Sequence, residues 1–119
     1  MEEQTQLVEA IIKGIQEKKG SEIVVSDLTS ILTAPCKFFV ICQGNSPQQV
    51  EAITRSVEEM ARTQAGEKPA AIVGRTQAQW VAMDYGTVIV HIFLPDVRDY
   101  YDLEHLWEDA PVTRVPEVN

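Results

Sequence analysis

FFVICQGNSPQQ, residues 38–49, places an apolar run directly before a helix start. The run over residues 38–42 is too short for a helix and rich in strand-forming residues, which predicts a strand buried on both faces. Behind it, Ser46 can accept a hydrogen bond from a first-turn N–H, Pro47 suits the first helical position and Gln49 completes a capping box. A buried strand followed by a capped helix is typical of an α/β domain.

Working outward, apolar residues at helical spacing continue this helix to about residue 64, where Gly66 can end it. Upstream, another apolar stripe predicts a first helix that Thr5 caps and Gly20 ends. A strand over residues 22–27 follows it, and a loop over 29–37 contains Pro35. The two stripes consist of Leu7, Val8, Ile11, Ile12 and Ile15, and of Val50, Ile53, Val57, Met60 and Ala61.

Downstream, strands are predicted over residues 71–73, 80–84 and 88–93, the last two as a hairpin around Gly86. Residues 96–107 predict one broken or two short helical segments, and a loose tail begins at Pro111. We therefore expect a single α/β domain with a mixed five-stranded sheet flanked by helices. The expected bounds are residues 1–110 for the domain and 111–119 for a short tail.

Charge narrows the possible partners. The 119 residues contain 10 Lys and Arg against 18 Asp and Glu, for a formal net charge of −8, and residues 96–119 hold seven of the acids but two of the bases. This distribution argues against direct, charge-driven DNA or RNA binding and favours a basic partner. No apolar run is long enough to span a membrane, and the acidic N-terminus is no targeting signal, so we expect a cytoplasmic protein.

The residue types needed for catalysis are sparse. Cys36 and Cys42 are too few for a zinc site, and neither Asp27 nor Asp84 has a second acid two residues away. His91 alternates with apolar strand residues, so we interpret it as a packed core histidine with one hydrogen-bonded nitrogen. His105 should be solvated, and Ser46 is interpreted as a simple helix cap. We expect no catalytic residues, no metal and no cofactor.

Aromatic and acidic residues gather in the C-terminal half. Extrapolated as one helix, this segment puts Tyr100 on one face with Leu103, Leu106 and Trp107. Two interpretations stay open: the stripe docks the terminal helix on the sheet, or Trp80 and Leu103 form an exposed anchor within a polar rim. The segment contains Tyr100, Tyr101, Leu103, Leu106 and Trp107, with Asp99, Asp102, Glu104 and Glu108 between them.

At these residues the chain resembles the ribosomal silencing factor family RsfS, also called Iojap. The blocks that match occur in family order, and the resemblance covers about residues 5–110. Each block alone is weak, but their combination is highly specific. The blocks are GSEIVVSDL at 20–28, FVICQGNS at 39–46, WVAMDYG at 80–86, VHIF at 90–93 and YDLEHLW at 101–107.

The resemblance implies a non-enzymatic protein with a fold related to the nucleotidyltransferase superfamily but without its catalytic acids. Family members bind the large ribosomal subunit through its protein uL-fourteen, obstruct joining of the small subunit and lower translation when nutrients are scarce. Whether the free protein is a monomer or a homodimer stays open. Trp80 and Leu103 match the family's partner-contact positions, and adjacency makes weaker candidates of Asp84, Tyr85, Asp102 and Glu104.

Two departures from the family pattern each remove an acid. Lys37 stands between Cys36 and Phe38 where the family often has Asp, and Val73 precedes Gly74 where an acidic residue is common. Both weaken any catalytic interpretation. Two alternatives remain: a nucleotidyltransferase-like enzyme with Ser46 at a phosphate and Asp84 or Asp27 on a metal, and an adaptor whose protein partner is not ribosomal.

Overall fold

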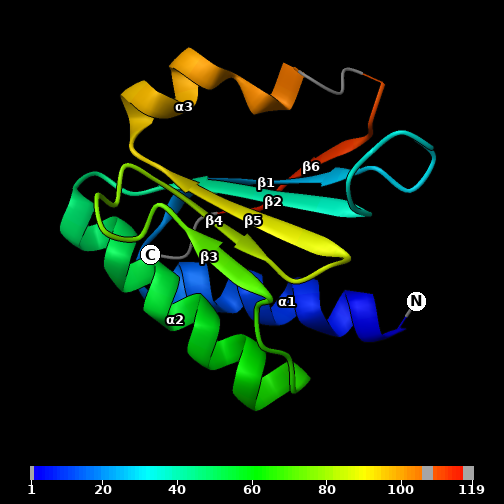
Figure 1. Ribbon diagram of the computed structural model, residues 1–119, viewed down its shortest axis with the longest axis horizontal. Helices are drawn as coiled ribbons and strands as arrows, with labels where there is room; N and C mark the ends of the chain where they lie inside the picture. Colours follow the sequence, from blue (N-terminus) through cyan, green and yellow to red (C-terminus); the bar gives the residue numbers. More distant parts are fainter. Residues whose placement is uncertain (1, 106–108, 117–119) are drawn as a thin grey trace.

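A six-stranded mixed sheet separates two helices on one face from a third helix on the other, as Figure 1 shows. The computed structural model describes residues 2–105 and 109–116. The elements are α1 (Glu2–Glu17), β1 (Ser21–Asp27), β2 (Phe38–Gln43), α2 (Pro47–Ala65), β3 (Ala71–Val73), β4 (Trp80–Asp84), β5 (Val88–Phe93), α3 (Pro95–Tyr101), the 3₁₀-helix η1 (Leu103–His105) and β6 (Val112–Arg114).

The strand order is β3-β4-β5-β2-β1-β6, and β2 and β5 are the parallel pair at its centre. All other neighbours are antiparallel, including the predicted hairpin of β4 and β5. Phe38 pairs with Val88, and Trp80 pairs with Phe93. The register therefore places Trp80 at the sheet end where β5 leads into α3.

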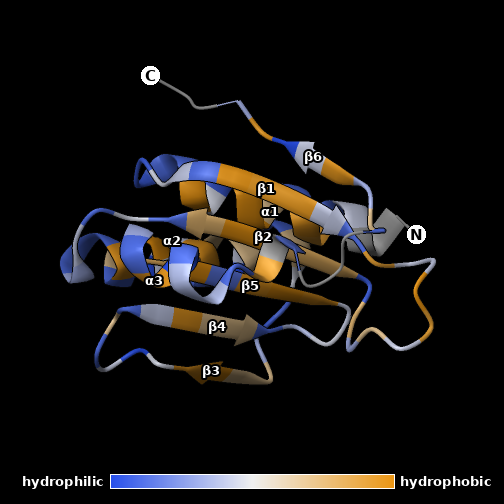
Figure 2. Ribbon diagram, turned by 90° about the horizontal axis from the view of Figure 1, so that it is seen from above, coloured by the Kyte–Doolittle hydropathy of each residue, from blue (hydrophilic) through white to orange (hydrophobic). Residues whose placement is uncertain are grey.

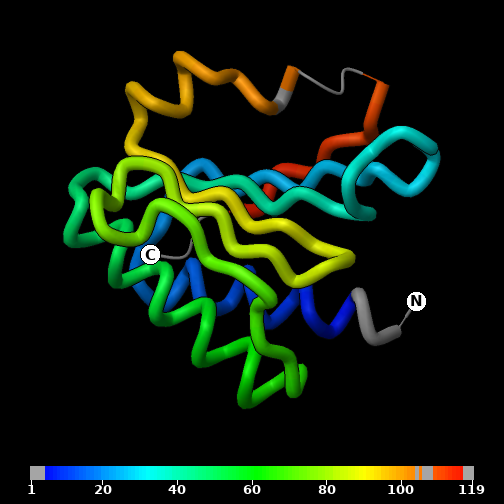
Figure 3. The backbone as a smooth tube through the Cα atoms, in the orientation of Figure 1, coloured from blue at the N-terminus to red at the C-terminus, as the bar shows by residue number. Residues whose placement is uncertain are grey.

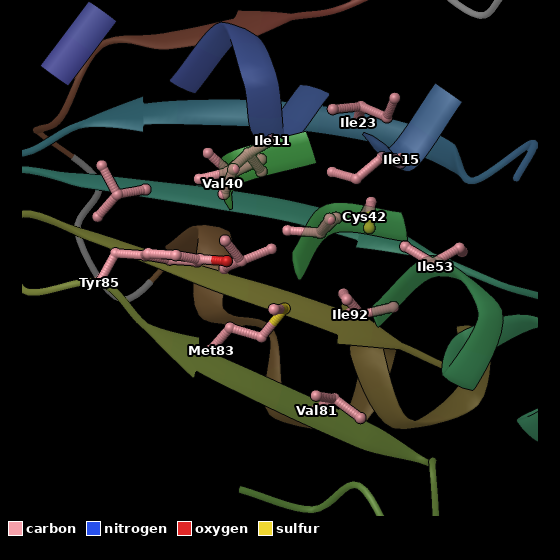
Figure 4. Close-up of a cluster of buried hydrophobic side chains, with 14 of the residues drawn as sticks. Ile11, Ile15, Ile23, Val40, Cys42, Ile53, Val81, Met83, Tyr85 and Ile92 are labelled. Carbon is pink, nitrogen blue, oxygen red and sulfur yellow. The ribbon is translucent and has the colours of Figure 1, made fainter. Parts of the chain in front are cut away.

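The main hydrophobic core lies between the sheet and the α1–α2 pair (Figure 4). Alternate strand residues such as Val40, Met83 and Ile92 point into it and are fully buried. The central strands are correspondingly apolar in Figure 2. Helix α1 approaches α2 closely because Gly14 has no side chain: a Cβ there would lie 2.7 Å from the Cα of Val57.

A smaller cluster lies on the opposite face, beneath α3. It contains Val24, Leu28, Phe39, Ile41, Phe93 and Ala110, with Trp80 and Leu103 packed against it as half-buried residues. Burial on both faces explains the apolar run at residues 38–42 of β2, as the sequence predicts.

The predicted start of α2 is confirmed. Ser46 Oγ accepts a hydrogen bond from Gln49 N at 3.1 Å, and Pro47 occupies the first turn. Gly66 ends the helix with φ +66°. The Gln49 side chain does more than predicted, since its Nε2 also donates to the backbone oxygens of Lys18 and Lys19 at 3.1 Å. It thereby ties the end of α1 to the start of α2.

Two expectations are wrong in detail. The sheet has six strands instead of five, because residues 112–114 of the expected loose tail pair with β1 as β6. Helix α1 begins at Glu2 and not after Thr5, since acidic residues suit the positive end of a helix. The expectation of a broken C-terminal helical segment is confirmed: α3 ends at Tyr101 because Asp102 turns left-handed with φ +50°, and the chain arches over the sheet in two short pieces (Figure 3).

No helix in the described part of the chain is long and apolar enough to cross a membrane.

Candidate partner-binding site

Trp80 lies half-buried at the first position of β4, under the start of α3. Its indole stacks on the buried ring of Phe93, with ring centroids 5.1 Å apart and planes 25° apart. Helix α3 begins two residues after Phe93, so the chain returns over the indole. The ring centroid of Tyr101, at the end of that helix, is 4.5 Å from that of Trp80.

A shallow groove of about 410 Å³ opens where Trp80 and α3 meet. Tyr101 lies against Tyr100 edge-on, with ring centroids 5.1 Å apart. Tyr100 is 82% exposed and Tyr101 is 51% exposed, so the row of rings runs from the core through Trp80 to solvent. The groove is lined by Gly74, Gln77, Gln79, Trp80, Asp96, Val97, Tyr100 and Tyr101.

The helix that borders this groove is acidic. Asp96 lines the groove, and Asp99 and Asp102 are exposed further along α3 and its C-terminal cap. The one base of α3, Arg98, is buried and faces inward, donating to the backbone oxygen of Glu22 at 2.7 Å and to Gln43 Oε1 at 3.2 Å. The arginine therefore anchors the helix to the sheet and leaves the carboxylates at the surface, next to the exposed rings.

Leu103, the other principal predicted contact, is half-buried in η1 and packs against the same cluster as Trp80. The structure thus places both residues on the α3 face of the sheet. Trp80 belongs to the sheet and Leu103 to the segment that covers it. The described part of that segment docks on the sheet through Leu103, and the role of both side chains in partner contact stays a prediction.

The structure does not bring Asp84 and Tyr85 to this groove. They lie at the opposite end of β4, where Asp84 pairs with Ile89. Asp84 Oδ1 accepts a hydrogen bond from Gly86 N at 2.7 Å and so closes the hairpin turn. Tyr85 is buried in the main core on the α1–α2 side, and its burial raises the pKa of the phenol.

Asp102 lies beside the groove, and its carboxylate is hydrogen-bonded to the His105 ring. Its backbone N–H donates to the oxygen of Arg98 and closes α3. The backbone of Glu104 belongs to η1, while its side chain, Leu106 and Trp107 lie outside the described residues. Tyr100 and Tyr101 were missed as site residues because a continuous helix would turn Tyr100 inward. The sequence signal that could have identified both tyrosines is their position among four acidic residues, Asp96, Asp99, Asp102 and Glu104.

His91 lies directly beneath the groove and is 7% exposed. Its Nδ1 accepts a hydrogen bond from the Trp80 indole N–H at 3.0 Å, which confirms the interpretation of a packed histidine with one bonded nitrogen. Its Nε2 is buried without a hydrogen-bond partner among the described residues. Burial lowers the pKa of His91 to about 4 because the surroundings solvate the imidazolium poorly.

This depressed pKa predicts a loss of stability in mild acid. An unfolded histidine takes up a proton near pH 6.5, while folded His91 stays neutral until about pH 4. The unfolded state therefore binds more protons between these values, and the free energy of unfolding should fall as pH falls, by about 2 kcal/mol from pH 7 to pH 5. Urea denaturation at both pH values measures the change. His91→Phe should largely abolish it, and an unchanged slope in that variant would contradict the assignment.

The residues of the enzymatic alternative do not converge. Ser46 follows β2 at the end where Gln43 pairs with Phe93, whereas Asp27 and Asp84 lie at the other end, which Phe38 and Ile89 mark. A six-residue strand separates these ends by roughly 18 Å. Among the described residues, no group of three His, Cys, Asp or Glu side chains could hold a metal ion.

Each side chain of that alternative also has a local structural role. Asp27 Oδ1 accepts hydrogen bonds from the backbone and hydroxyl of Thr29, which lower the pKa of the carboxyl. Ser46 caps α2 and Asp84 closes the hairpin. Cys42 is inert, since complete burial raises the pKa of its thiol to about 12. In the described part of the chain, these side chains are therefore occupied locally and are not assembled into one set of reacting groups.

The comparisons with known proteins agree with one another. The family model described as "Ribosomal silencing factor during starvation" matches residues 1–119. The chain is 37% identical to the ribosomal silencing factor RsfS of Halalkalibacterium halodurans, covering 95% of each, and 40% identical to that of Bacillus subtilis, covering 81% of this chain and 80% of the relative. A crystal structure of a Chromobacterium violaceum protein superposes with a TM-score of 0.81 at 36% identity, covering 87% and 85% of the two chains.

Proposed function

The chain belongs to the RsfS family of ribosomal silencing factors, and from that premise we propose that it represses translation by binding the large ribosomal subunit. Bound through ribosomal protein uL-fourteen, it blocks the small subunit from joining and acts without catalysis, in the cytoplasm, when nutrients are limiting. The observation that supports this best is the groove at Trp80 beside the acidic helix α3, where exposed rings continue outward from a buried cluster.

Charge supports a protein target over an RNA target. The phosphates of ribosomal RNA would repel the exposed carboxylates of Asp96, Asp99 and Asp102, whereas most ribosomal proteins are basic. The rings at the groove supply the apolar contact, because protein interfaces favour Trp and Tyr inside a polar rim. Together these features select a basic protein patch on the ribosome.

Simple occupancy is sufficient for the effect. A specific interface buries roughly 1,200–2,000 Å² in total, which a domain of this size can provide. At a free concentration about 100-fold above its dissociation constant, a ligand that excludes the small subunit opposes joining by about 2.7 kcal/mol. That corresponds to about a hundredfold shift in the association equilibrium, so no chemical step is required.

The test has two stages. Purified large subunits are first sedimented with the protein, and small subunits are then added to the same mixture to measure joining. We expect saturable cosedimentation and a joining rate that falls as the binding site fills. Unchanged joining at saturation would refute the blocking mechanism, and no cosedimentation would favour the non-ribosomal adaptor. Calorimetric titration with a nucleoside triphosphate and Mg²⁺ addresses the enzymatic alternative, which requires saturable binding.

Ionic strength should separate the electrostatic contribution from the apolar one. Raising it from about 0.1 M to about 0.3 M shortens the Debye length from about 10 Å to about 6 Å. We expect association with large subunits to slow several-fold while dissociation changes little, because the charges along α3 act mainly on encounter. Stopped-flow mixing with a fluorescent protein measures both rates.

Two sets of variants, a test and its matched control, examine this salt dependence by removing acids from opposite faces of the sheet. Asp96→Asn combined with Asp99→Asn should slow association at low salt and flatten the salt dependence. Glu9→Gln combined with Glu17→Gln removes the same charge from two exposed acids on α1 and should leave both unchanged. Equal effects from both sets would show that overall net charge, and not the acids of α3, directs the encounter.

A further inference from the structure

Two polar ring atoms meet beneath α3. The Trp80 Nε1 lies 3.0 Å from His91 Nδ1, across the antiparallel pair of β4 and β5. An indole N–H can only donate, so His91 Nδ1 must accept. The imidazole is therefore neutral, and its single proton is on Nε2.

Packing holds the His91 ring in place. The edge of Phe39 meets it with ring centroids 4.8 Å apart and planes 81° apart, and Phe93 lies nearly parallel at 6.0 Å and 16°. His91 Nε2 is buried with no partner among the described residues. A buried unpaired N–H is unfavourable, and a phenylalanine would fill this space without it. What histidine offers at this position, and phenylalanine does not, is an acceptor for the Trp80 N–H.

The same bond selects one orientation of the indole. Phe93 and Tyr101 contact the ring of Trp80 and restrict its tilt, and the hydrogen bond adds a directional constraint that ring packing lacks. Turned by 180° about its Cβ–Cγ bond, the indole would exchange its N–H edge with its six-membered ring, and His91 Nδ1 would face carbon in place of its donor. Acceptance by His91 fixes the N–H inward and thereby determines which part of the indole borders the groove.

We propose that neutral His91 is a positioning residue for partner recognition, holding the Trp80 indole in the orientation that the partner contacts. This inference rests on the proposed function, because it takes the Trp80 groove as the binding site. It adds a residue that does not itself reach the partner. Preorganising a contact side chain strengthens binding because less conformational freedom is lost when the complex forms.

Two substitutions separate the hydrogen bond from the packing. His91→Phe keeps a ring against Phe39 and Phe93 but removes the acceptor, whereas His91→Asn keeps an acceptor oxygen near the position of Nδ1. We expect His91→Phe to bind large subunits about tenfold more weakly, as the loss of one such bond implies. We expect His91→Asn to recover most of that loss. Equal weakening in both variants would overturn the proposal.

A binding cycle and a spectroscopic measurement supply independent tests. In a Trp80→Phe background the indole donor is absent, so His91→Phe should cause no further loss of affinity; a second tenfold loss would refute the coupling. Nitrogen NMR of the unsubstituted free protein should show Nδ1 of His91 unprotonated and Nε2 protonated. The opposite tautomer would also overturn the proposal, even if the variants did not fold.

The outcomes distinguish this inference from the proposed function. If the unsubstituted protein fails to bind large subunits, the proposed function fails, and the NMR result still decides the tautomer. If it binds and His91→Phe binds equally well, the positioning role is refuted while the proposed function stands.

Discussion

Trp80→Ala is expected to weaken binding to large ribosomal subunits at least about a hundredfold, an effect typical of an interface hot spot. The Trp80 indole packs against the buried ring of Phe93 and against the exposed ring of Tyr101. Truncation removes the indole from the groove and also withdraws the surface on which Tyr101 packs. Titrated cosedimentation of the variant with purified large subunits measures the loss.

The control must exclude simple unfolding. Truncating a half-buried tryptophan costs about 3 kcal/mol, and it leaves His91 Nδ1 without the donor that it has now. Binding is therefore compared under conditions where urea denaturation shows both proteins fully folded in a cooperative transition. Leu32→Ala removes a fully exposed apolar side chain from the β1–β2 loop, and should bind normally. Normal binding by a folded Trp80→Ala variant would mean that Trp80 serves the core alone.

Local signals predicted most of the fold. The capping residues Ser46 and Gly66 appear where expected because each satisfies backbone groups within its own helix end. Strand alternation placed His91 on the correct face, since side chains of one strand must alternate. These features depend on neighbours along the chain, which a single sequence displays directly.

Features that depend on distant residues were harder to predict. Strand β6 is short, and all three of its residues are exposed, so it has no apolar pattern and is recognised only by its pairing with β1. The left-handed turn at Asp102 ends α3 early, and this separates the face that carries Tyr100 from the one that carries Leu103. A single non-helical residue changes the direction in which every later side chain points relative to the helix before it.

The candidate site was predictable in part for the same reason. Trp80 and Asp84 share a strand face, which alternation predicts, but they lie at the two ends of β4, four residue steps and roughly 13 Å apart. The prediction grouped Asp84 with Trp80 because they belong to one sequence motif, although the two side chains lie at opposite ends of β4. Tyr101 reaches Trp80 because the predicted hairpin brings the end of β5 beside the start of β4 and α3 then returns over the sheet, a direction of the chain that the sequence does not display.

Ile53→Ala is expected to lower the free energy of unfolding by about 4 kcal/mol, within the range of large-to-small core substitutions. Ile53 is fully buried in the main core between α2 and the sheet (Figure 4). Its Cδ1 occupies space that two glycines leave open: a Cβ on Gly20 would lie 3.2 Å from it, and one on Gly44 would lie 3.3 Å away. Neither glycine has a side chain that can move into the vacated volume, so the cavity should persist.

Urea denaturation measures the loss, and Arg55→Ala on the same helix is the matched control. Its side chain is 74% exposed and pairs only at the surface with Glu51, which is worth about 0.5 kcal/mol or less. Because Ile53 faces away from α3, the folded fraction of Ile53→Ala should bind large subunits with unchanged affinity. A loss below about 1 kcal/mol would mean that the core collapses around the missing side chain. A loss of affinity in folded protein would mean that the α1–α2 face, and not the Trp80 groove alone, contributes to the interface.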